Sequence, residues 1–343
     1  MNKKVLLILP VICLLAGACA KKQVSNTGLY AQEYIQKWME KYHPGISANA
    51  DGLYILEDTP GNGLEWTGDK DYILARSTIY TLGGSISSTT DEELSKQLGT
   101  YVQGNYYGPK YQIIGEDYSY AGVDALLSGM RIGGTRKAVI PAWMLTSSRY
   151  KTQKEYLDAC TNSTHLIYEI TLEGQTDNPE QDAVTFLTNY VHNHYGSDIE
   201  SVSYITDEEA DGTFWFISDV SGFKEEDALS ENATVNINYT GKLARTGTVF
   251  DTTLEKVAKD AYIFSESKTY EPQSVTLSTT YSDITMGDSS SLISGFKGGL
   301  SKMHFKGQKA TVLFTSQHGY ASSGSGNTIP AFAPLIFELE IVK

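Results

Sequence analysis

Cysteine, proline and basic residues are scarce in this 343-residue chain, and their scarcity excludes several classes of protein. Three cysteines are too few for the disulfide framework of a small secreted domain. Lys and Arg total 27 against 41 Asp and Glu, a formal net charge of -14, which argues against binding to nucleic acid or to anionic lipid head groups. Beyond its N-terminal segment the chain has no apolar run long enough to span a bilayer. Its length is that of about two domains.

The N-terminal segment indicates export. Two lysines precede the apolar residues 5–15, a run too short to span a membrane and typical of a signal peptide. The small residues directly before Cys19 resemble a bacterial lipobox, in which cleavage leaves the cysteine as the lipid-bearing first residue. We therefore expect a signal peptide over 1–18 and a lipid anchor at Cys19, with Ala20 favouring the outer membrane over the inner; the protein then faces either the periplasm or the cell surface. The alternative is an ordinary signal peptide followed by a chance cysteine.

Cleavage would leave a more acidic protein with one thiol. Two lysines leave with the segment, so 25 basic residues face 41 acidic ones, a formal charge of -16. Cys13 leaves as well and Cys19 is acylated, so no disulfide is possible within one chain. The remaining Cys160 is expected to be a small packed residue before a strand rather than a reactive thiol.

The chain repeats one pattern twice. Asp51-Gly52 and Asp211-Gly212 each open a short apolar, β-prone run. An amphipathic helical stretch precedes each opening, with apolar residues at three-to-four spacing, and a strand of alternating character closes each unit. The helical stretches are 31–42 and 181–195, and the closing strands are 166–172 and 335–341. The pattern predicts a tandem pair of units, each made of a helix followed by a domain.

Short β-rich runs and one short helix fill each unit. In the second unit the runs are 233–239, 274–279 and 309–315, and the helix is 295–303. This composition predicts an α+β fold in which an antiparallel sheet curls around one short helix. The predicted segments after the signal peptide are an anchor segment and helix over 19–48, a first domain over 49–175, a linker helix and turn over 176–210, and a second domain over 211–343.

A set of aromatic residues with one acid recurs in the second unit. Tyr239-Thr240-Gly241 is followed at short range by Phe250-Asp251, and the later members of the set are residues 292–296, Tyr320, Ile329-Pro330 and the closing strand. In that order and spacing they resemble the FKBP-type peptidyl-prolyl cis-trans isomerases. The resemblance is close over 212–343 and loose over 51–174, and it implies two tandem FKBP-like domains.

The resemblance also implies roles for these side chains. Tyr320 would donate its hydroxyl to the substrate carbonyl, and Asp251 would sit beside Tyr239 with its carboxylate near the twisting amide. Ile329 would flank the pocket from a glycine-rich loop, and Leu292 would offer a backbone amide to the peptide. The walls and floor that hold the proline ring would be Tyr239, Phe250, Ile293, Phe296 and Phe337.

The implied function is peptidyl-prolyl cis-trans isomerisation of exported proteins, assisting their folding. Rotation about an X-Pro bond breaks no bond, so the resemblance implies no metal and no cofactor. The implied partners are unfolded or proline-containing polypeptides and, as in other members, a macrolide ligand. Two alternatives stay open: a non-catalytic chaperone or peptide-binding lipoprotein, and a structural subunit of a surface complex.

The second unit departs from the family in a few places. Phe296 stands where the best-known members carry tryptophan, which keeps the floor apolar but makes it smaller. Ser291 replaces an acidic residue, and Ala331 replaces the second proline of the usual Ile-Pro-Pro. The connection over 252–290 is much longer than usual. It is either a lid or peptide-binding extension beside the pocket, or a surface elaboration.

The first unit keeps the pattern but not the site. Arg76 falls where the pocket tyrosine belongs, Ile86-Ser87 where Phe-Asp belongs, and Val123 at the floor. Residues 142–144 replace the turn that carries the second tyrosine. We therefore expect a binding or spacer domain without isomerase activity. The histidine pair at 192 and 194 is two residues apart on a helix, which points the side chains to different sides and argues against a shared metal.

Overall fold

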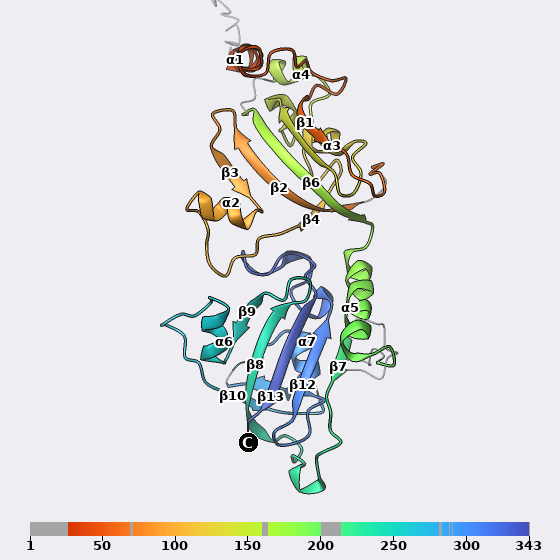
Figure 1. Ribbon diagram of the computed structural model, residues 1–343, viewed down its shortest axis with the longest axis vertical. Helices are drawn as coiled ribbons and strands as arrows, with labels where there is room; N and C mark the ends of the chain where they lie inside the picture. The colour runs from red at the N-terminus through yellow and green to blue at the C-terminus, as the bar shows by residue number, and fades with distance from the viewer. Residues whose placement is uncertain are drawn as a thin grey trace, which may run out of the picture.

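The computed structural model describes residues 27–68, 71–159, 164–199, 214–280, 283–287, 289 and 291–342. Two sheet domains follow one another along the long axis of the molecule, and the C-terminus lies at the far end of the second (Figure 1). The first domain contains α1 (Thr27–Tyr42), β1 (Tyr54–Thr59), β2 (Tyr72–Thr81), β3 (Ile86–Thr89), α2 (Glu92–Gln97), β4 (Lys110–Ile113), α3 (Ala121–Leu127), β5 (Thr135–Ile140), η1 (Ala142–Met144), α4 (Gln153–Asp158) and β6 (Leu166–Thr176).

The second domain is preceded by a long helix that lies beside its sheet. Its elements are α5 (Pro179–Tyr195), β7 (Phe214–Ile217), η2 (Glu225–Asp227), β8 (Thr234–Leu243), β9 (Val249–Thr252), α6 (Glu255–Asp260), β10 (Gln273–Thr276), β11 (Thr285–Met286), α7 (Ser294–Leu300), β12 (Lys309–Phe314), η4 (Ser316–His318), η5 (Ala321–Ser323) and β13 (Leu335–Ile341).

The two sheets share one topology. In the first domain the strand order is β1-β5-β6-β2-β3, with β4 also paired to β2; in the second it is β7-β12-β13-β8-β10-β11, with β9 also paired to β8. Every pairing between these strands is antiparallel. The α+β fold with two tandem domains is therefore confirmed, and β2, β5 and β6 of the first domain correspond to β8, β12 and β13 of the second.

A pair of threonines in each domain aligns the two domains residue by residue. The side-chain oxygens of Thr78 and Thr89 are 2.8 Å apart across β2 and β3, and those of Thr240 and Thr252 are 2.9 Å apart across β8 and β9. Each pair faces across the same strand pairing, next to the central strand. Thr78 therefore corresponds to Thr240, which fixes the equivalence of every other position in these strands.

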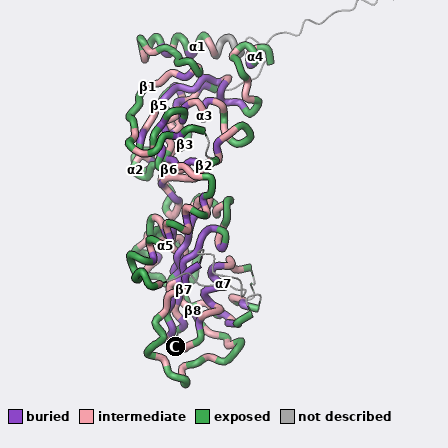
Figure 2. Tube along the Cα trace, turned by 90° about the vertical axis from the view of Figure 1, so that its right-hand side faces the viewer, coloured by how far each residue is buried: buried purple, intermediate pink, exposed green. Residues whose placement is uncertain are grey.

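A short helix packs on the inner face of each sheet. In the second domain α7 lies against β12, and Gly295 on α7 faces the buried ring of Phe314. In the first domain α3 lies against β5, and Gly122 faces Ile140 in the same way. Figure 2 shows buried residues running along the strands of both domains, with exposed residues on the outer helices. This is the predicted arrangement of a sheet curled around one short helix.

A longer helix covers the outer face of the second sheet. The side chain of Asn178 accepts a hydrogen bond from a backbone N–H of the first turn, Pro179 occupies the first turn, and the chain leaves α5 at Gly196 with φ +107°. Because of this start α5 begins two residues before the predicted 181–195. Leu187 and Val191 are fully buried against β7, β12 and β13.

The helix before the first domain packs in the equivalent place. Ile35 and Met39 of α1 are buried against Val139 of β5 and Ile167 of β6. By the strand correspondence these two partners are the counterparts of Leu313 and Ile336, on which α5 packs. The predicted repeat of a helix followed by a domain thus extends to the individual contacts.

Some element boundaries differ from the sequence prediction. The closing strand β13 has the predicted bounds, but β8 continues past Tyr239 to Leu243 because it pairs with seven residues of β13. The helix predicted over 295–303 ends at Leu300, because Met303 already makes the short-range bond of a turn, from its N–H to the Leu300 carbonyl at 3.1 Å.

Two sequence predictions fall outside the described residues. The signal peptide over 1–18 and the lipid-anchor candidate Cys19 precede the first described helix, and Cys160 lies in the break between α4 and β6. Over the part of the chain that the structure describes, no helix combines the length and the apolar character needed to cross a membrane.

Candidate functional site

The pairing of β8 with β9 brings the acid to the first tyrosine. Gly241 pairs with Asp251, and the side chain of Asp251 turns back to accept a hydrogen bond from the Tyr239 hydroxyl at Oδ2, 2.8 Å away. Its other oxygen accepts the backbone N–H of Thr252 at 2.9 Å and forms an ion pair with Lys268. The carboxylate is therefore held at a fixed place at the edge of the aromatic cluster.

Phe337 is the centre of that cluster. It is 5% exposed, and four rings surround it: Phe296 at 5.1 Å, Phe250 at 5.7 Å, Phe314 at 5.8 Å and Tyr239 at 6.3 Å between centroids. Phe296 and Phe250 meet it edge to face, which is the preferred geometry for aromatic pairs. Strand β13 places Phe337 here because its odd-numbered residues all face inward.

Gly241 leaves the room that these rings occupy. A Cβ on Gly241 would lie 2.6 Å from Phe250 Cζ and 3.0 Å from Phe337 Cε1, closer than real Cβ contacts. Gly241 also pairs directly with Phe337 across β8 and β13. The glycine of the Tyr-Thr-Gly motif is thus needed for close packing of the pocket rings.

The N-terminus of α7 supplies the floor. Ile293 stands just before the helix, and Phe296 in its first turn is 4% exposed and meets the Tyr239 ring edge to face at 5.4 Å. Leu292 and Ile293 are partly buried against the same cluster. The backbone contact from Leu292 to a bound peptide stays a prediction.

The loop between β12 and β13 brings the remaining two residues. Tyr320 is half-buried against the cluster, and Ile329 is 4% exposed within it. We call the segment Ala321–Phe332 the flap. Its turn is tight: the Ser325 N–H donates to the Ile329 carbonyl at 2.8 Å, and Gly324 has φ +63° where a Cβ would lie 2.3 Å from that carbonyl oxygen.

Burial keeps both site tyrosines protonated. Desolvation raises the pKa of the Tyr239 hydroxyl, and the charge of Asp251 and its hydrogen bond raise it further, because a phenolate would be repelled by the carboxylate. Desolvation, followed by the charge of Asp251, also raises the pKa of Tyr320. Both phenols are therefore hydrogen-bond donors throughout the neutral pH range, and the shift at Tyr320 places it within electrostatic reach of Asp251.

All nine predicted site residues come together in the second domain. Eight belong to one cluster of buried or partly buried side chains, and Asp251 joins it through Tyr239. The eight are Tyr239, Phe250, Leu292, Ile293, Phe296, Tyr320, Ile329 and Phe337. Their assembly is a geometric fact, whereas their roles with a substrate remain to be tested.

Two residues of the site were not predicted. Lys268, in the long insertion, pairs with Asp251, and its ammonium lies 5.5 Å from the centroid of the Tyr270 ring. Phe314 stacks on Phe337 with an angle of 10° between the planes. Phe314 could have been found from the alternation of its strand, but no local pattern links Lys268 to the acid.

The first domain has no tyrosine at the position that corresponds to Tyr239. The Ser77 N–H donates to the Thr90 hydroxyl at 3.0 Å, as the Tyr239 N–H donates to the Thr253 hydroxyl at 2.9 Å, so Ser77 corresponds to Tyr239. The prediction that Arg76 takes this position was wrong by one residue. Side chains alternate along a strand, and Arg76 instead forms a partly exposed ion pair with a glutamate of β6.

The predicted counterpart of Asp251 in the first domain was also one residue away from the observed one. Gly241 pairs with Asp251, and Ile79 pairs with Ser88 at the equivalent point of the first sheet. The prediction of Ile86-Ser87 was therefore wrong by one residue: Ser87 is the extra residue of a bulge in β3, as Phe250 is in β9, so Ser87-Ser88 is the counterpart of Phe250-Asp251. The first domain has a serine where the second has its acid.

A hollow remains where the first domain would hold its own proline. It has a volume of about 510 Å³. Val123 stands at the floor, as predicted, and Tyr168 takes the place of Phe337. The lining includes Ser77, Ile79, Ser119, Tyr120, Val123 and Tyr168. Ser77 and Val123, which stand where the second domain has Tyr239 and Phe296, are smaller and leave this space open.

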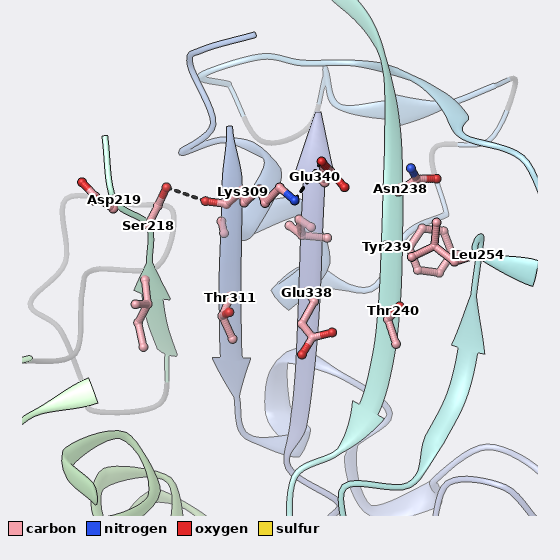
Figure 3. Close-up of a pocket in the computed structure, with 13 residues that line it drawn as sticks. Ser218, Asp219, Asn238, Tyr239, Thr240, Leu254, Lys309, Thr311, Glu338 and Glu340 are labelled. Atoms are coloured by element: carbon pink, nitrogen blue, oxygen red, sulfur yellow. Dashed lines mark hydrogen bonds and ion pairs between the residues drawn. The ribbon is translucent and has the colours of Figure 1, made fainter. Parts of the chain in front are cut away.

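The second domain has a hollow of about 380 Å³ on the opposite face of its sheet (Figure 3). Thr311, Glu338 and Thr240 lie side by side across β12, β13 and β8, and Lys309 pairs with Glu340 at 3.1 Å. These side chains face away from Phe337, because residues of opposite parity point to opposite faces of a sheet. Tyr239 of the aromatic cluster also lines this hollow.

Comparison with known proteins identifies relatives of the second domain. The family model described as FKBP-type peptidyl-prolyl cis-trans isomerase matches residues 225–342. An FK506-binding protein of Neisseria meningitidis serogroup B is 30% identical over 122 residues, which are 36% of this chain and 87% of that protein. FK506-binding protein 2 of Kluyveromyces lactis is 30% identical over 113 residues, 33% of this chain, and the chain spans 64% of its length.

Solved structures of the same family are also similar, at low scores. A peptidyl-prolyl cis-trans isomerase from Pseudomonas syringae pv. tomato has 22% identity and a TM-score of 0.30, over 48% of this chain and 92% of that one. The three FKBP domains of wheat FKBP73 have 15% identity and a TM-score of 0.28, over 87% and 98%. The assignment depends on the sequence relatives and the family model, and it agrees with the predicted enzyme class: the chain belongs to the FKBP-type peptidyl-prolyl cis-trans isomerase family.

Proposed function

We propose that the second domain catalyses cis-trans isomerisation of X-Pro bonds in exported polypeptides, in the pocket formed by the aromatic cluster around Phe337. The observation that carries this proposal is the convergence of all nine predicted side chains on one inner face of one sheet. Within the family the reaction needs no nucleophile, and the site offers apolar walls, one held carboxylate and two protonated phenols.

The chemistry suits such a site. Rotation about an X-Pro bond faces a barrier of ~20 kcal/mol from amide resonance. In the twisted transition state that resonance is lost, so the carbonyl is less polar than in the planar amide. Apolar walls made by Phe250, Phe296 and Phe337 disfavour the planar form more than the twisted one, which is differential binding. Each tenfold of rate requires about 1.4 kcal/mol of that preference.

In this proposal the polar groups orient the amide. Tyr320 donates its hydroxyl to the substrate carbonyl, and Asp251 lies beside the twisting bond. The Tyr239 hydroxyl and Lys268 hold the carboxylate in place, so no reorganisation is needed when the substrate binds. The same pocket would take a macrolide, the ligand for which two of the relatives are named.

Replacing Asp251 with alanine tests the proposal. The full chain is expected to accelerate exchange of a short Leu-Pro peptide in NMR exchange spectra, and Asp251→Ala to lower kcat/KM by about tenfold, the loss of one oriented polar contact. Asp260→Ala, which removes an exposed carboxylate on α6, is the matched control and should leave kcat/KM unchanged. A folded full chain that gives no acceleration would rule out the isomerase.

A second candidate is non-catalytic binding of polypeptides. The open hollow of about 510 Å³ in the first domain favours it, because that space has tyrosines at its walls but neither the acid nor the floor ring of an isomerase. The same NMR experiment separates the two functions. Peptide-induced shifts without exchange enhancement would favour binding alone.

We further propose that the protein is a lipoprotein of the bacterial outer membrane, anchored at Cys19 and facing the periplasm or the cell surface. The small residues before Cys19 support this proposal. After the signal peptide, the proposed segments are 19–48, 49–175, 176–210 and 211–343. Cys19→Ser is expected to move the protein from the membrane to the soluble fraction of fractionated cells. Unchanged membrane association of that variant would refute the anchor.

A further inference from the structure

A loop of the first domain reaches the proposed pocket of the second. We call residues 99–109, between α2 and β4, the rim loop. Its Tyr106 N–H donates to the Asn327 carbonyl of the flap at 2.7 Å, and the Tyr106 ring is 9% exposed within the core cluster of the second domain. The Tyr106 hydroxyl donates to the Pro109 carbonyl at 2.9 Å. The flap that carries Ile329 is therefore bonded to the first domain.

The end of the flap is also fixed by the first domain. Phe332 meets Tyr72 of β2 edge to face at 5.3 Å and Tyr111 of β4 at 5.8 Å. Next to this contact, Arg245 of the second domain forms an ion pair with Asp182 of α5 at 2.6 Å. The two domains thus meet at the flap itself, so the position of the flap depends on both.

On the other side, the rim loop meets the insertion between β9 and α7. A Cβ built on Gly104 would lie 3.9 Å from Ile263 Cγ2, so the side chain of Ile263 packs beside the rim loop at Gly104. From there the contacts lead back to the acid: Phe264 stacks on Tyr270 at 5.3 Å, Lys268 lies over Tyr270, and Lys268 pairs with Asp251. The flap, the rim loop and the insertion therefore form a continuous series of contacts from Ile329 to Asp251.

The junction of rim loop and insertion exposes apolar side chains. Val102 is 53% exposed, Tyr262 73% and Phe264 40%. Tyr262 has φ +58°, a strained conformation for a tyrosine. Within the rim loop, Tyr101 stacks on Tyr107 at 5.3 Å. Exposed apolar side chains on two structured segments, one from each domain, indicate a surface that binds a partner.

We propose that the rim loop and the insertion together form an apolar docking surface for the stretch of unfolded polypeptide that flanks the isomerised proline. The inference rests on the proposed function, since the surface is continuous with the proposed pocket. An extended chain advances about 3.3 Å per residue, so a few residues beside the bound proline are enough to reach beyond the pocket edge onto an adjoining surface. The first domain then takes part in substrate recognition without having a catalytic site of its own.

Peptide length gives the test. Two peptides share one Leu-Pro core: a short one, and a long one with Leu and Phe residues added at about two to four positions on either side. In the full chain, Val102→Ser combined with Tyr262→Asn is expected to raise KM for the long peptide about tenfold with kcat unchanged, since binding lost equally in ground and transition states appears in KM. Asparagine tolerates the positive φ at 262.

The short peptide and a control variant complete the design. The double variant should process the short peptide at the unmodified rate, because neither residue lies in the pocket. Leu64→Ser removes a side chain that is 72% exposed between β1 and β2. It should change neither KM nor kcat for either peptide. Equal KM values of the unmodified chain and the double variant for the long peptide would overturn the proposed docking surface. An equal loss of kcat/KM on the short and the long peptide would overturn it as well. No acceleration of either peptide by the unmodified chain would instead refute the isomerase itself.

Discussion

Replacing Phe337 with alanine is expected to abolish isomerisation and to lower the free energy of unfolding of the second domain by about 3–5 kcal/mol. The ring is 5% exposed, and four other rings pack against it. Its removal therefore eliminates four aromatic contacts at once. The cavity that remains would let Phe250 and Phe296 collapse into the pocket. Activity is measured by NMR exchange with the short Leu-Pro peptide, and stability by urea denaturation.

Phe337→Leu separates the two effects. Leucine keeps an apolar side chain in the core and should cost less stability than alanine, yet it lacks the flat ring that packs against Phe250 and Phe296. We expect it to stay folded while kcat/KM falls by about tenfold or more. Full activity in a folded Phe337→Leu or Phe337→Ala chain would show that the proline site lies elsewhere.

Adding one methyl group at Gly295 is expected to destabilise the second domain by about 1–3 kcal/mol or more, although alanine normally favours a helix over glycine by about 1 kcal/mol. A Cβ at this position would lie 2.4 to 2.5 Å from three ring atoms of Phe314, so α7 would have to move off the sheet. Since Phe296 is the next residue, the pocket floor would move with it. Gly295→Ala should therefore lose both stability and activity.

The equivalent glycine of the first domain provides a matched comparison. A Cβ on Gly122 would lie 2.2 Å from Ile140 Cγ2, so Gly122→Ala should destabilise the first domain similarly while the short Leu-Pro peptide is still processed. Gly222→Ala, with no atom within 4 Å of the added Cβ, should be neutral. The two transitions are followed by urea denaturation of the full chain. A Gly295→Ala chain as stable as the Gly222→Ala chain would contradict the packing described here.

The resemblance of the sequence to the FKBP family named the nine side chains that the structure brings together. The burial pattern of β13 agrees with that assignment of Phe337, because its odd-numbered residues are all buried. Tyr239, Gly241 and Asp251 lie on two strands joined by a short connection, which fixes their pairing. The repeat of helix and domain was likewise visible, because α1 and α5 carry their apolar residues at helical spacing.

The first domain shows where local pattern fails. Arg76 and Ile86-Ser87 were each placed one residue away from the true counterparts, Ser77 and Ser87-Ser88. The partner strands of β2 carry the extra residues, Glu173 of β6 opposite Leu74-Ala75 and Ser87 of β3 opposite Ile79-Tyr80, and neither bulge is visible as a break in the apolar pattern. Because side chains alternate with a period of two, a slip of one residue exchanges the inner face for the outer one.

By itself, then, the amino-acid sequence determined the two α+β units and the order of their elements, because periodicity and close-range pairing act over a few residues. Its family resemblance named the side chains of the aromatic cluster. Only the tertiary structure decided that Lys268 reaches Asp251, that Tyr106 of one domain enters the core of the other, and that Phe332 joins them. These contacts join segments far apart in the chain, and no local pattern encodes them, since they form only when both sheets have folded and packed together.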